Sequence, residues 1–168
     1  MKRKIILVMD NEENIRLRSI EERDIEELRL WKNRNASSFF YQKEISHEEQ
    51  EIWFSQYLLR PNDYIFMAEI QGDGEWYKFG CMGYRESGDE IDLYNIIRGN
   101  ETKMRSSMKT AMSILLNHLL EAYTKPIKCD VLVDNPAVKW YNRCGFYIRE
   151  IEEDYCIMQF SRDDRRSI

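Results

Sequence analysis

One segment near the C-terminal end of the chain constrains the fold most, because it encodes a strand, a helix and a second strand in close succession. The β-branched and aliphatic residues at 131–133 are typical of a buried strand. Asn135 can cap a helix, and Pro136 suits the first helical position, where no backbone N–H is needed. A short helix is expected over 137–144, and Gly145 is placed to end it in a left-handed conformation.

The same segment resembles the last conserved block of the GNAT superfamily of N-acetyltransferases. That block has an Asn, then an Ala, then an aliphatic-x-x-Tyr, and then Gly-Phe after a short spacer. The matching residues are, in order, Asn135, Ala137, Val138, Tyr141, Gly145 and Phe146. An ordinary β-α-β segment, with a packed tyrosine and a C-capping glycine, is the alternative interpretation.

Length and charge limit the classes of protein to which the chain can belong. The 168 residues predict a single domain (1–168) with a sizeable hydrophobic core. A net charge of −5 argues against a general nucleic-acid binder or a binder of anionic membranes, since both need a basic face. A local basic pocket for a phosphorylated ligand remains compatible with that charge.

Apolar runs and cysteines predict a cytoplasmic location. No apolar run approaches the length of a transmembrane helix, and the run at 4–9 is too short for a signal peptide. The cysteines form no Cys-x-x-Cys pair and are expected to be reduced, mostly buried thiols. They are Cys81, Cys129, Cys144 and Cys156. With only His47 and His118 present, a His-rich zinc site is not expected.

The N-terminal part of the chain predicts a strand hairpin and a first helix. Segments 2–9 and 15–20 have the apolar spacing of strands and can pair at one edge of a sheet, although the first can equally be a frayed terminus. A helix then opens between Ser19 and Asp24, with acidic residues early, as the helix dipole favours. The apolar side of this helix is expected to consist of Ile25, Leu28, Leu30 and Trp31.

A second helix and the loop before it carry a further resemblance. A capping box of Ser46 and Glu49 predicts the start of this helix, and Arg60 and Pro61 mark its end. The region resembles one GNAT branch, which acetylates ribosomal-protein N-termini or amino groups of nucleotide-linked sugars, and the sugar-amine members look closer. The matching residues are Leu28, Arg29, Trp31, Lys32, Asn33, Phe39, Phe40, Ile45, Ser46, Glu48, Glu49, Gln50, Trp53 and Phe54.

The resemblance implies that this region forms one wall of the pocket for the acceptor amine. The residues expected there are Trp31, Asn33, Phe39, Phe40 and Tyr41. Packing in the core is the alternative, and it is favoured for Trp31 as for Trp53 and Phe54. The contiguous aromatic residues at 39–41 are harder to bury together in a loop, so pocket and core are equally compatible with them.

The middle of the chain predicts an antiparallel meander followed by a long helix. Segments 64–70, 76–84 and 90–98 have strand patterns and are joined by turns that contain glycine. Ser106 or Ser107 then caps a helix whose apolar residues recur at helical spacing.

The last elements complete a recognisable order. A strand at 127–133 leads into the segment described first, and a final strand is expected at 155–160, followed by a mobile tail at 161–168. The order of elements resembles the GNAT acyl-CoA N-acyltransferase fold. The expected fold class is therefore α/β (α+β), with a central mixed, mostly antiparallel sheet flanked by helices.

The resemblance implies acetyl-CoA as co-substrate. In GNAT enzymes it binds where the fourth and fifth strands separate, and a glycine-containing loop leads into the long helix, whose N-terminus favours pyrophosphate. Here Ser106 and Met108 stand in the positions of the two glycines. The residues expected to bind acetyl-CoA are Leu93, Asn95, Ile96, Lys103, Met104, Arg105, Ser106, Ser107, Met108, Asn135 and Tyr141.

The resemblance also implies direct acetyl transfer to an amine. Tyr141 stands in the position of the acid that protonates the leaving thiolate. Asn135 stands where the family binds the pantetheine arm or nearby backbone, and backbone N–H groups at 93–96 can polarise the thioester carbonyl. The base stays open between Asp92 and Tyr94, which share a strand face, and Glu69, Glu90 or a water relay.

Two classes of function are compatible with these residues. The first is an N-acetyltransferase for an amino sugar or a nucleotide-linked amino sugar, with protein N-terminal acetylation as the alternative; Lys32, Arg34 and Lys43 are possible partners of a diphosphate. The second is a non-catalytic CoA-binding protein of the GNAT type, which the absent glycines favour. The expected assembly is a monomer or a homodimer paired through the last strands, without nucleic acid, membrane or metal.

Overall fold

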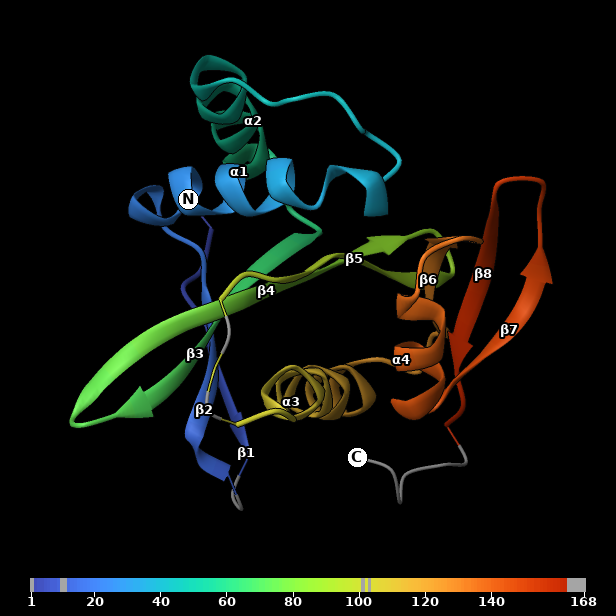
Figure 1. Ribbon diagram of the computed structural model, residues 1–168. Helices are drawn as coiled ribbons and strands as arrows, with labels where there is room; N and C mark the ends of the chain where they lie inside the picture. Colours follow the sequence, from blue (N-terminus) through green and yellow to red (C-terminus); the bar gives the residue numbers. More distant parts are fainter. Residues whose placement is uncertain (1, 10–11, 101, 103, 163–168) are drawn as a thin grey trace.

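A computed structural model describes residues 2–9, 12–100, 102 and 104–162. Within these ranges, the strands form one eight-stranded sheet in the order β1-β2-β3-β4-β5-β6-β8-β7 (Figure 1). The strands are β1 (Ile6–Met9), β2 (Glu12–Ser19), β3 (Asp63–Gly72), β4 (Glu75–Ser87), β5 (Glu90–Arg98), β6 (Ile127–Leu132), β7 (Phe146–Ile151) and β8 (Tyr155–Phe160). The helices are η1 (Glu22–Asp24), α1 (Ile25–Arg34), η2 (Ala36–Ser38), α2 (His47–Leu59), α3 (Ser107–Ala122) and α4 (Ala137–Arg143).

Strand direction confirms the mixed, mostly antiparallel sheet. β5 and β6 run parallel, and the other neighbouring pairs are antiparallel. The expected hairpin is formed by β1 and β2 at one edge, and the meander by β3, β4 and β5. Asp73 and Gly74 in the β3–β4 turn and Gly88 in the β4–β5 turn have positive φ, as tight hairpin turns require.

Two hydrophobic clusters cover the two faces of the sheet. The larger cluster packs α3 and α4 against one face, and the smaller one packs α1 and α2 against the other (Figure 1). In α1, Leu28 and Trp31 are buried, but Leu30 is 52 % exposed, so its prediction as a core-facing residue was wrong. Leu28 and Trp31 are three residues apart and share a helix face, whereas Leu30 points away from it.

The segment that constrains the fold most has the predicted β-α-β form. Asn135 Oδ1 accepts a hydrogen bond from the Ala137 N–H at 2.9 Å, but the helix begins at Ala137 with Pro136 as its N-cap, one residue later than predicted. Gly145 has φ of 96°, which confirms the left-handed end of α4. The helix itself ends at Arg143, one residue earlier than predicted.

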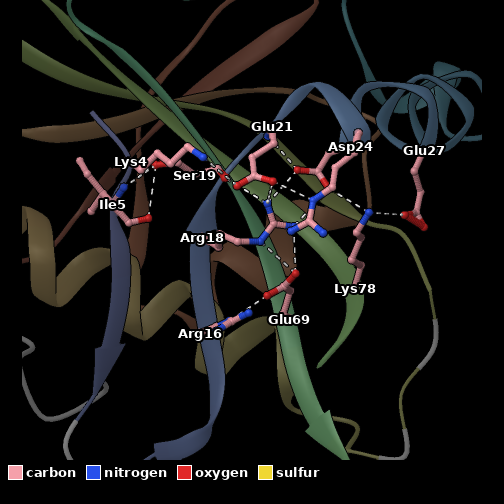
Figure 2. Close-up of polar contacts among 11 residues, drawn as sticks. Lys4, Ile5, Arg16, Arg18, Ser19, Glu21, Asp24, Glu27, Glu69 and Lys78 are labelled. Atoms are coloured by element: carbon pink, nitrogen blue, oxygen red, sulfur yellow. Dashed lines mark hydrogen bonds and ion pairs between the residues drawn. The ribbon is translucent and has the colours of Figure 1, made fainter. Parts of the chain in front are cut away.

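A buried ion cluster joins the sheet to the start of α1 (Figure 2). Arg18 of β2 donates to both oxygens of Asp24, at 2.9 and 3.1 Å, and to Glu69 of β3 at 2.9 Å. Lys78 of β4 adds a 2.8 Å ion pair to Asp24, and Arg16 adds a 2.7 Å pair to Glu69. The cluster therefore ties three strands and η1 together beneath α1.

Other expectations concern cysteines, metals and membranes. The four cysteines are buried and free, as predicted. Within the described ranges, no group of three or more His, Cys, Asp or Glu side chains is placed to hold a metal ion. In the same part of the chain, no helix is long and apolar enough to cross a membrane. The tail beyond residue 162 lies outside the described residues.

Candidate active site

The sheet opens between its two parallel strands. β5 and β6 are paired only from Ile91–Ile127 to Leu93–Cys129. Beyond Leu93, β5 follows β4, while β6 beyond Cys129 follows β8. The two strands therefore diverge at Leu93, as the resemblance implied.

A β-bulge lies directly beyond this point. Cys81 of β4 is opposite Ile97 and Gly83 is opposite Tyr94, so Asn95 and Ile96 face a single residue of β4. Asn95 has φ of 50°, a left-handed conformation that asparagine tolerates better than most residues. The bulge turns the backbone of β5 at the point where the strands separate.

A cavity of about 790 Å³ occupies the divergence, within the usual size range of ligand pockets. β5 contributes its lining from Asp92 to Arg98, and β6 contributes Asp130 and Val131. The start of α3, the segment 135–143 and the α1–α2 connection supply the remaining walls. Segments far apart in the sequence therefore meet around one space.

The lining of this large cavity is predominantly cationic. Its basic residues are Lys32, Arg85, Arg98, Arg105 and Arg143, and its acidic residues are Asp92 and Asp130. Five basic residues against two acidic ones contrast with the chain's net charge of −5. Such a concentration of positive charge favours an anionic ligand.

Tyr141 of α4 is buried and lines the large cavity. Its ring packs edge-on against Trp140 and Phe146, with centroids 5.1 and 5.5 Å away. Burial raises the pKa of Tyr141 well above its usual value, so the hydroxyl stays protonated. Among the described residues, no side chain or backbone group hydrogen-bonds this hydroxyl, which leaves it able to donate to a ligand.

Asp92 and Tyr94 also line the large cavity, but both already have partners. Asp92 pairs with Arg85 at 3.0 Å through one oxygen and with Lys128 at 3.3 Å through the other. The Tyr94 hydroxyl donates to the buried carboxylate of Asp63. Burial and the Asp63 charge raise the pKa of Tyr94.

The two glutamates considered as alternative bases lie outside the large cavity lining. Glu69 belongs to the buried ion cluster, where Arg18 and Arg16 hold its carboxylate. Glu90 pairs with Arg149 at 2.9 Å. Their carboxylates therefore bind cations of the fold rather than face the cavity.

Asn135 connects the start of α4 to the α1–α2 connection. Its Nδ2 donates to the Ser38 carbonyl at 3.3 Å, across 97 positions of sequence. Nearby, the rings of Phe40 and Tyr155 meet edge-on with centroids 5.7 Å apart. The connection is thereby held against α4 and β8, and covers part of the large cavity.

The loop before α3 contributes only some of its predicted residues. Arg105 and Met108 line the large cavity, whereas Met104, Ser106 and Ser107 do not. Ser107 is buried, and its hydroxyl contacts that of Thr102 at 3.0 Å. Lys103 lies outside the described residues.

Of the residues predicted to form the acceptor wall, only some line the large cavity. Phe39, Phe40 and Tyr41 line the large cavity. Trp31 lies in the core beneath α1 and α2, and Asn33 exchanges hydrogen bonds with the backbone of Ile45 at 2.8 and 3.0 Å. Trp31 and Asn33 therefore support the α1–α2 connection rather than line the cavity.

A smaller cavity of about 250 Å³ lies between α1, α2 and the sheet. Its walls include Leu28, Gln50 and Trp53, and it shares Lys32, Asn95 and two further lining residues with the large cavity. The two spaces therefore adjoin at the bulge of β5.

Sequence reasoning missed several residues of the large cavity, among them Arg85, Arg98, Trp140 and Arg143. For Arg85 a signal exists, because the short turn after β4 places it directly opposite Asp92 in the hairpin. Arg98 and Arg143 carry no such local signal, since only the tertiary fold brings the end of β5 near the end of α4.

Comparisons with known proteins define the fold. Neither the known protein-family models nor the curated protein sequences contain a match. Among solved structures, the spermidine N-acetyltransferase from Vibrio cholerae, in complex with CoA and spermine, matches with a TM-score of 0.76 and 20% identity, over 92% of this chain and 99% of that one. The chain has the fold of the GNAT acetyltransferases.

Other GNAT structures match with similar coverage. Apo FdhC, a nucleotide-linked sugar GNAT, matches with a TM-score of 0.76 and 15% identity, over 91% of this chain and 89% of that one. RimL, a ribosomal L7/L12 alpha-N-protein acetyltransferase in complex with CoA, matches with a TM-score of 0.71 and 15% identity, over 92% of this chain and 96% of that one. The GNAT fold is thus shared with enzymes named for three different acceptors.

Proposed function

We propose that the protein is an N-acetyltransferase that uses acetyl-CoA to acetylate a primary amine, and that the acceptor is an amino sugar or a nucleotide-linked amino sugar. The observation that carries the proposal is the cationic cavity at the divergence of β5 and β6. Two of the structures with this fold, the spermidine enzyme and RimL, were crystallised with CoA.

The chemistry of the cavity suits a polyanionic co-substrate. CoA carries phosphate groups, and Arg105 at the start of α3 and Arg143 at the end of α4 are cations of the lining. Arginine binds phosphate well because its planar guanidinium offers several donors at once. In the proposed site, Leu93, Asn95, Ile96, Met108 and Asn135 line the pantetheine part, and the loop 104–107 contributes backbone.

The proposed chemistry assigns each chain residue a limited task. Acetyl-CoA supplies the acetyl group as a thioester. The hydroxyl of Tyr141, kept protonated by burial, gives its proton to the leaving sulfur. The bulge at Asn95 and Ile96 orients backbone toward the carbonyl to be attacked.

The structure leaves fewer candidates for the general base than the sequence did. Both oxygens of Asp92 bind cations, and the Tyr94 hydroxyl donates a hydrogen bond to Asp63. Because the polar atoms of both residues already have partners, we assign Asp92 and Tyr94 to the wall of the site and proton removal to water. The aromatic residues Phe39, Phe40 and Tyr41 are proposed to cover the acceptor.

Thermal unfolding with and without acetyl-CoA tests the co-substrate site. A ligand at about 100 times its Kd adds about 2.7 kcal/mol, which corresponds to about 5–10 °C for a domain of this size. We expect such a shift for the wild-type protein and a smaller one for Arg105→Ala. The matched control is the exposed, cavity-remote Arg23→Ala, which should keep the full shift. No shift at millimolar acetyl-CoA would refute the site.

Activity measurements then separate the alternative functions. CoA release that depends on an added amino sugar supports the proposed enzyme. Release that depends instead on an N-terminal peptide of a ribosomal protein supports the runner-up function. Tight acetyl-CoA binding without amine-dependent release from any acceptor supports a non-catalytic CoA-binding protein. We also propose that the protein is located in the cytoplasm and is a monomer or a homodimer.

A further inference from the structure

Lys32, near the end of α1, lies where the two cavities adjoin. It lines both of them. Its Nζ donates to Asn95 Oδ1 at 3.3 Å and lies 5.6 Å from the centroid of the Phe39 ring. The ammonium group is therefore beside the bulge of β5, next to the place proposed for the reacting acetyl group.

The charge of Lys32 is not neutralised by the described part of the chain. Within that part, no carboxylate lies within ion-pair distance of its Nζ. Glu49 lines the small cavity, but one of its oxygens accepts the Ser46 N–H at 2.8 Å in the capping box. The contacts of Lys32 are thus an amide oxygen and an aromatic ring, both weaker partners for an ammonium than a carboxylate.

The surroundings make this uncompensated charge costly. Burial lowers the pKa of Lys32, and the neighbouring cation of Arg85 acts in the same direction. Arg85 itself is held by Asp92 at 3.0 Å and lies over the Tyr94 ring at 4.2 Å. A half-buried ammonium without a counter-ion, near a second cation, is an arrangement that an anionic ligand stabilises.

The position of Lys32 separates it from the cations proposed for CoA. Arg105 and Arg143 belong to the α3 and α4 side of the sheet, whereas α1 lies on the opposite side (Figure 1). The small cavity that Lys32 lines is enclosed by α1 and α2. Lys32 shares the large cavity with Arg105 and Arg143, but through the small cavity it is also open to a ligand on the α1–α2 side.

We propose that Lys32 is a specificity-determining residue that selects acceptors with an anionic group, a phosphate or a carboxylate, near the amine. The inference rests on the proposed function and names the acceptor class more narrowly. Arg85 supports the selection by adding positive potential. Polycationic amines are disfavoured, because they would bring further positive charge next to Lys32 and Arg85.

Paired acceptors that differ in one anionic group test the selection. Glucosamine 6-phosphate and glucosamine form the phosphate pair, and leucine and leucinamide form the carboxylate pair. We expect the wild-type protein to prefer the anionic member of one pair in kcat/KM, which also identifies the kind of anion, and to use spermidine poorly.

Variants of Lys32 then attribute the preference to one side chain. Lys32→Met should lower kcat/KM for the preferred anionic acceptor about 10- to 100-fold and leave its neutral counterpart nearly unchanged. Lys32→Arg should retain most of the preference. The matched control is Lys4→Met, because the Lys4 side chain is 81% exposed and lines neither cavity. An equal loss for both members of each pair would overturn the proposal.

Binding without chemistry distinguishes failure of the inference from failure of the proposed function. Thermal unfolding with glucosamine 6-phosphate, leucine or inorganic phosphate, in the absence of acetyl-CoA, reports occupancy alone. A stabilisation that Lys32→Met abolishes and Lys4→Met retains supports the anion site even if no acetyl transfer is found. Absence of stabilisation by all three anions overturns it, even if acetyl transfer to a neutral amine is found.

Discussion

Replacing Arg18 by Met should lower the free energy of unfolding more than replacing any exposed arginine does. The Arg18 side chain is 8% exposed and pairs with Asp24, which is fully buried, and with Glu69, which is 5% exposed. Arg18→Met leaves both carboxylates buried with fewer partners. Breaking a buried ion pair from one side costs about 3–5 kcal/mol, a large part of the roughly 5–15 kcal/mol stability of a domain.

The remaining contacts place the effect of Arg18→Met within that range. Asp24 keeps its 2.8 Å pair with Lys78, and Glu69 keeps its 2.7 Å pair with Arg16 (Figure 2). We therefore expect the lower end, about 3 kcal/mol, or about 6–12 °C in Tm. Urea unfolding of the wild-type protein and the variant measures this difference.

Arg23→Met is the matched control for this measurement. Arg23 pairs with Glu21 at 2.7 Å in the same region, but its side chain is 66% exposed. Pairs of this kind contribute about 0–1 kcal/mol. If Arg18→Met lowered the free energy of unfolding no more than Arg23→Met, the buried cluster would not hold η1 to the sheet and the reasoning would be refuted.

The cluster also predicts a pH dependence. Burial alone would raise the pKa of Asp24 and of Glu69, but hydrogen bonds from Arg18 outweigh it and lower both below their usual values of 3.8 and 4.5. The stabilisation is therefore complete above the unfolded-state pKa values and is lost as pH falls through the lower folded-state values. The stability of the wild-type protein should decline below about pH 4, and less steeply in Arg18→Met.

Three further predictions concern the site and its frame. Tyr141→Phe should lower kcat by about 10²–10⁴-fold while the thermal shift with acetyl-CoA persists; loss of the shift instead would mean a packing role. Gly99→Ala should cost about 1–3 kcal/mol in urea unfolding, because its Cβ would overlap the Trp31 ring beneath α1. Gly145→Ala should cost about 1–2 kcal/mol by the same measurement, because φ of 96° is strained for alanine; an unchanged midpoint would contradict a rigid end of α4.

Elements with strong local signals were predictable from the sequence. The capping box of Ser46 and Glu49 starts α2 as expected, with both reciprocal hydrogen bonds present. The strands at 90–98 and 155–160 have the predicted bounds. In each case residues close together in sequence determine the conformation, so no tertiary information was needed.

Elements whose limits depend on pairing were predicted less well. β4 extends to Ser87, three residues beyond the predicted end at Tyr84, because Arg85 to Ser87 are polar but continue to pair with β5. The apolar side of α1 was wrong at Leu30 because hydrophobicity alone cannot distinguish a helix face in contact with the sheet from one in solvent. Both differences arise from tertiary contacts.

In the site, too, residues in a short local block were predictable, whereas the roles of others depend on the tertiary fold. Tyr141 and Asn135 could be anticipated because they belong to one short block. Trp31 and Asn33 match the resemblance equally well, yet they support the wall from behind. A sequence pattern shared by related folds contains both the residues that line a site and those that hold it in place. Only the three-dimensional structure distinguishes the two kinds.

The fold alone leaves the acceptor open, since enzymes named for a spermidine, a nucleotide-linked sugar and a ribosomal protein share it at 15–20% identity. In the proposed function, side chains on the α1–α2 side discriminate among such acceptors, because the ligand other than CoA is proposed to enter there. There Lys32 lines both cavities, and no carboxylate of the described chain lies within ion-pair distance of its Nζ. A cationic polyamine raises the electrostatic cost at this position and an anionic acceptor lowers it, so we expect Lys32 to favour the anionic class.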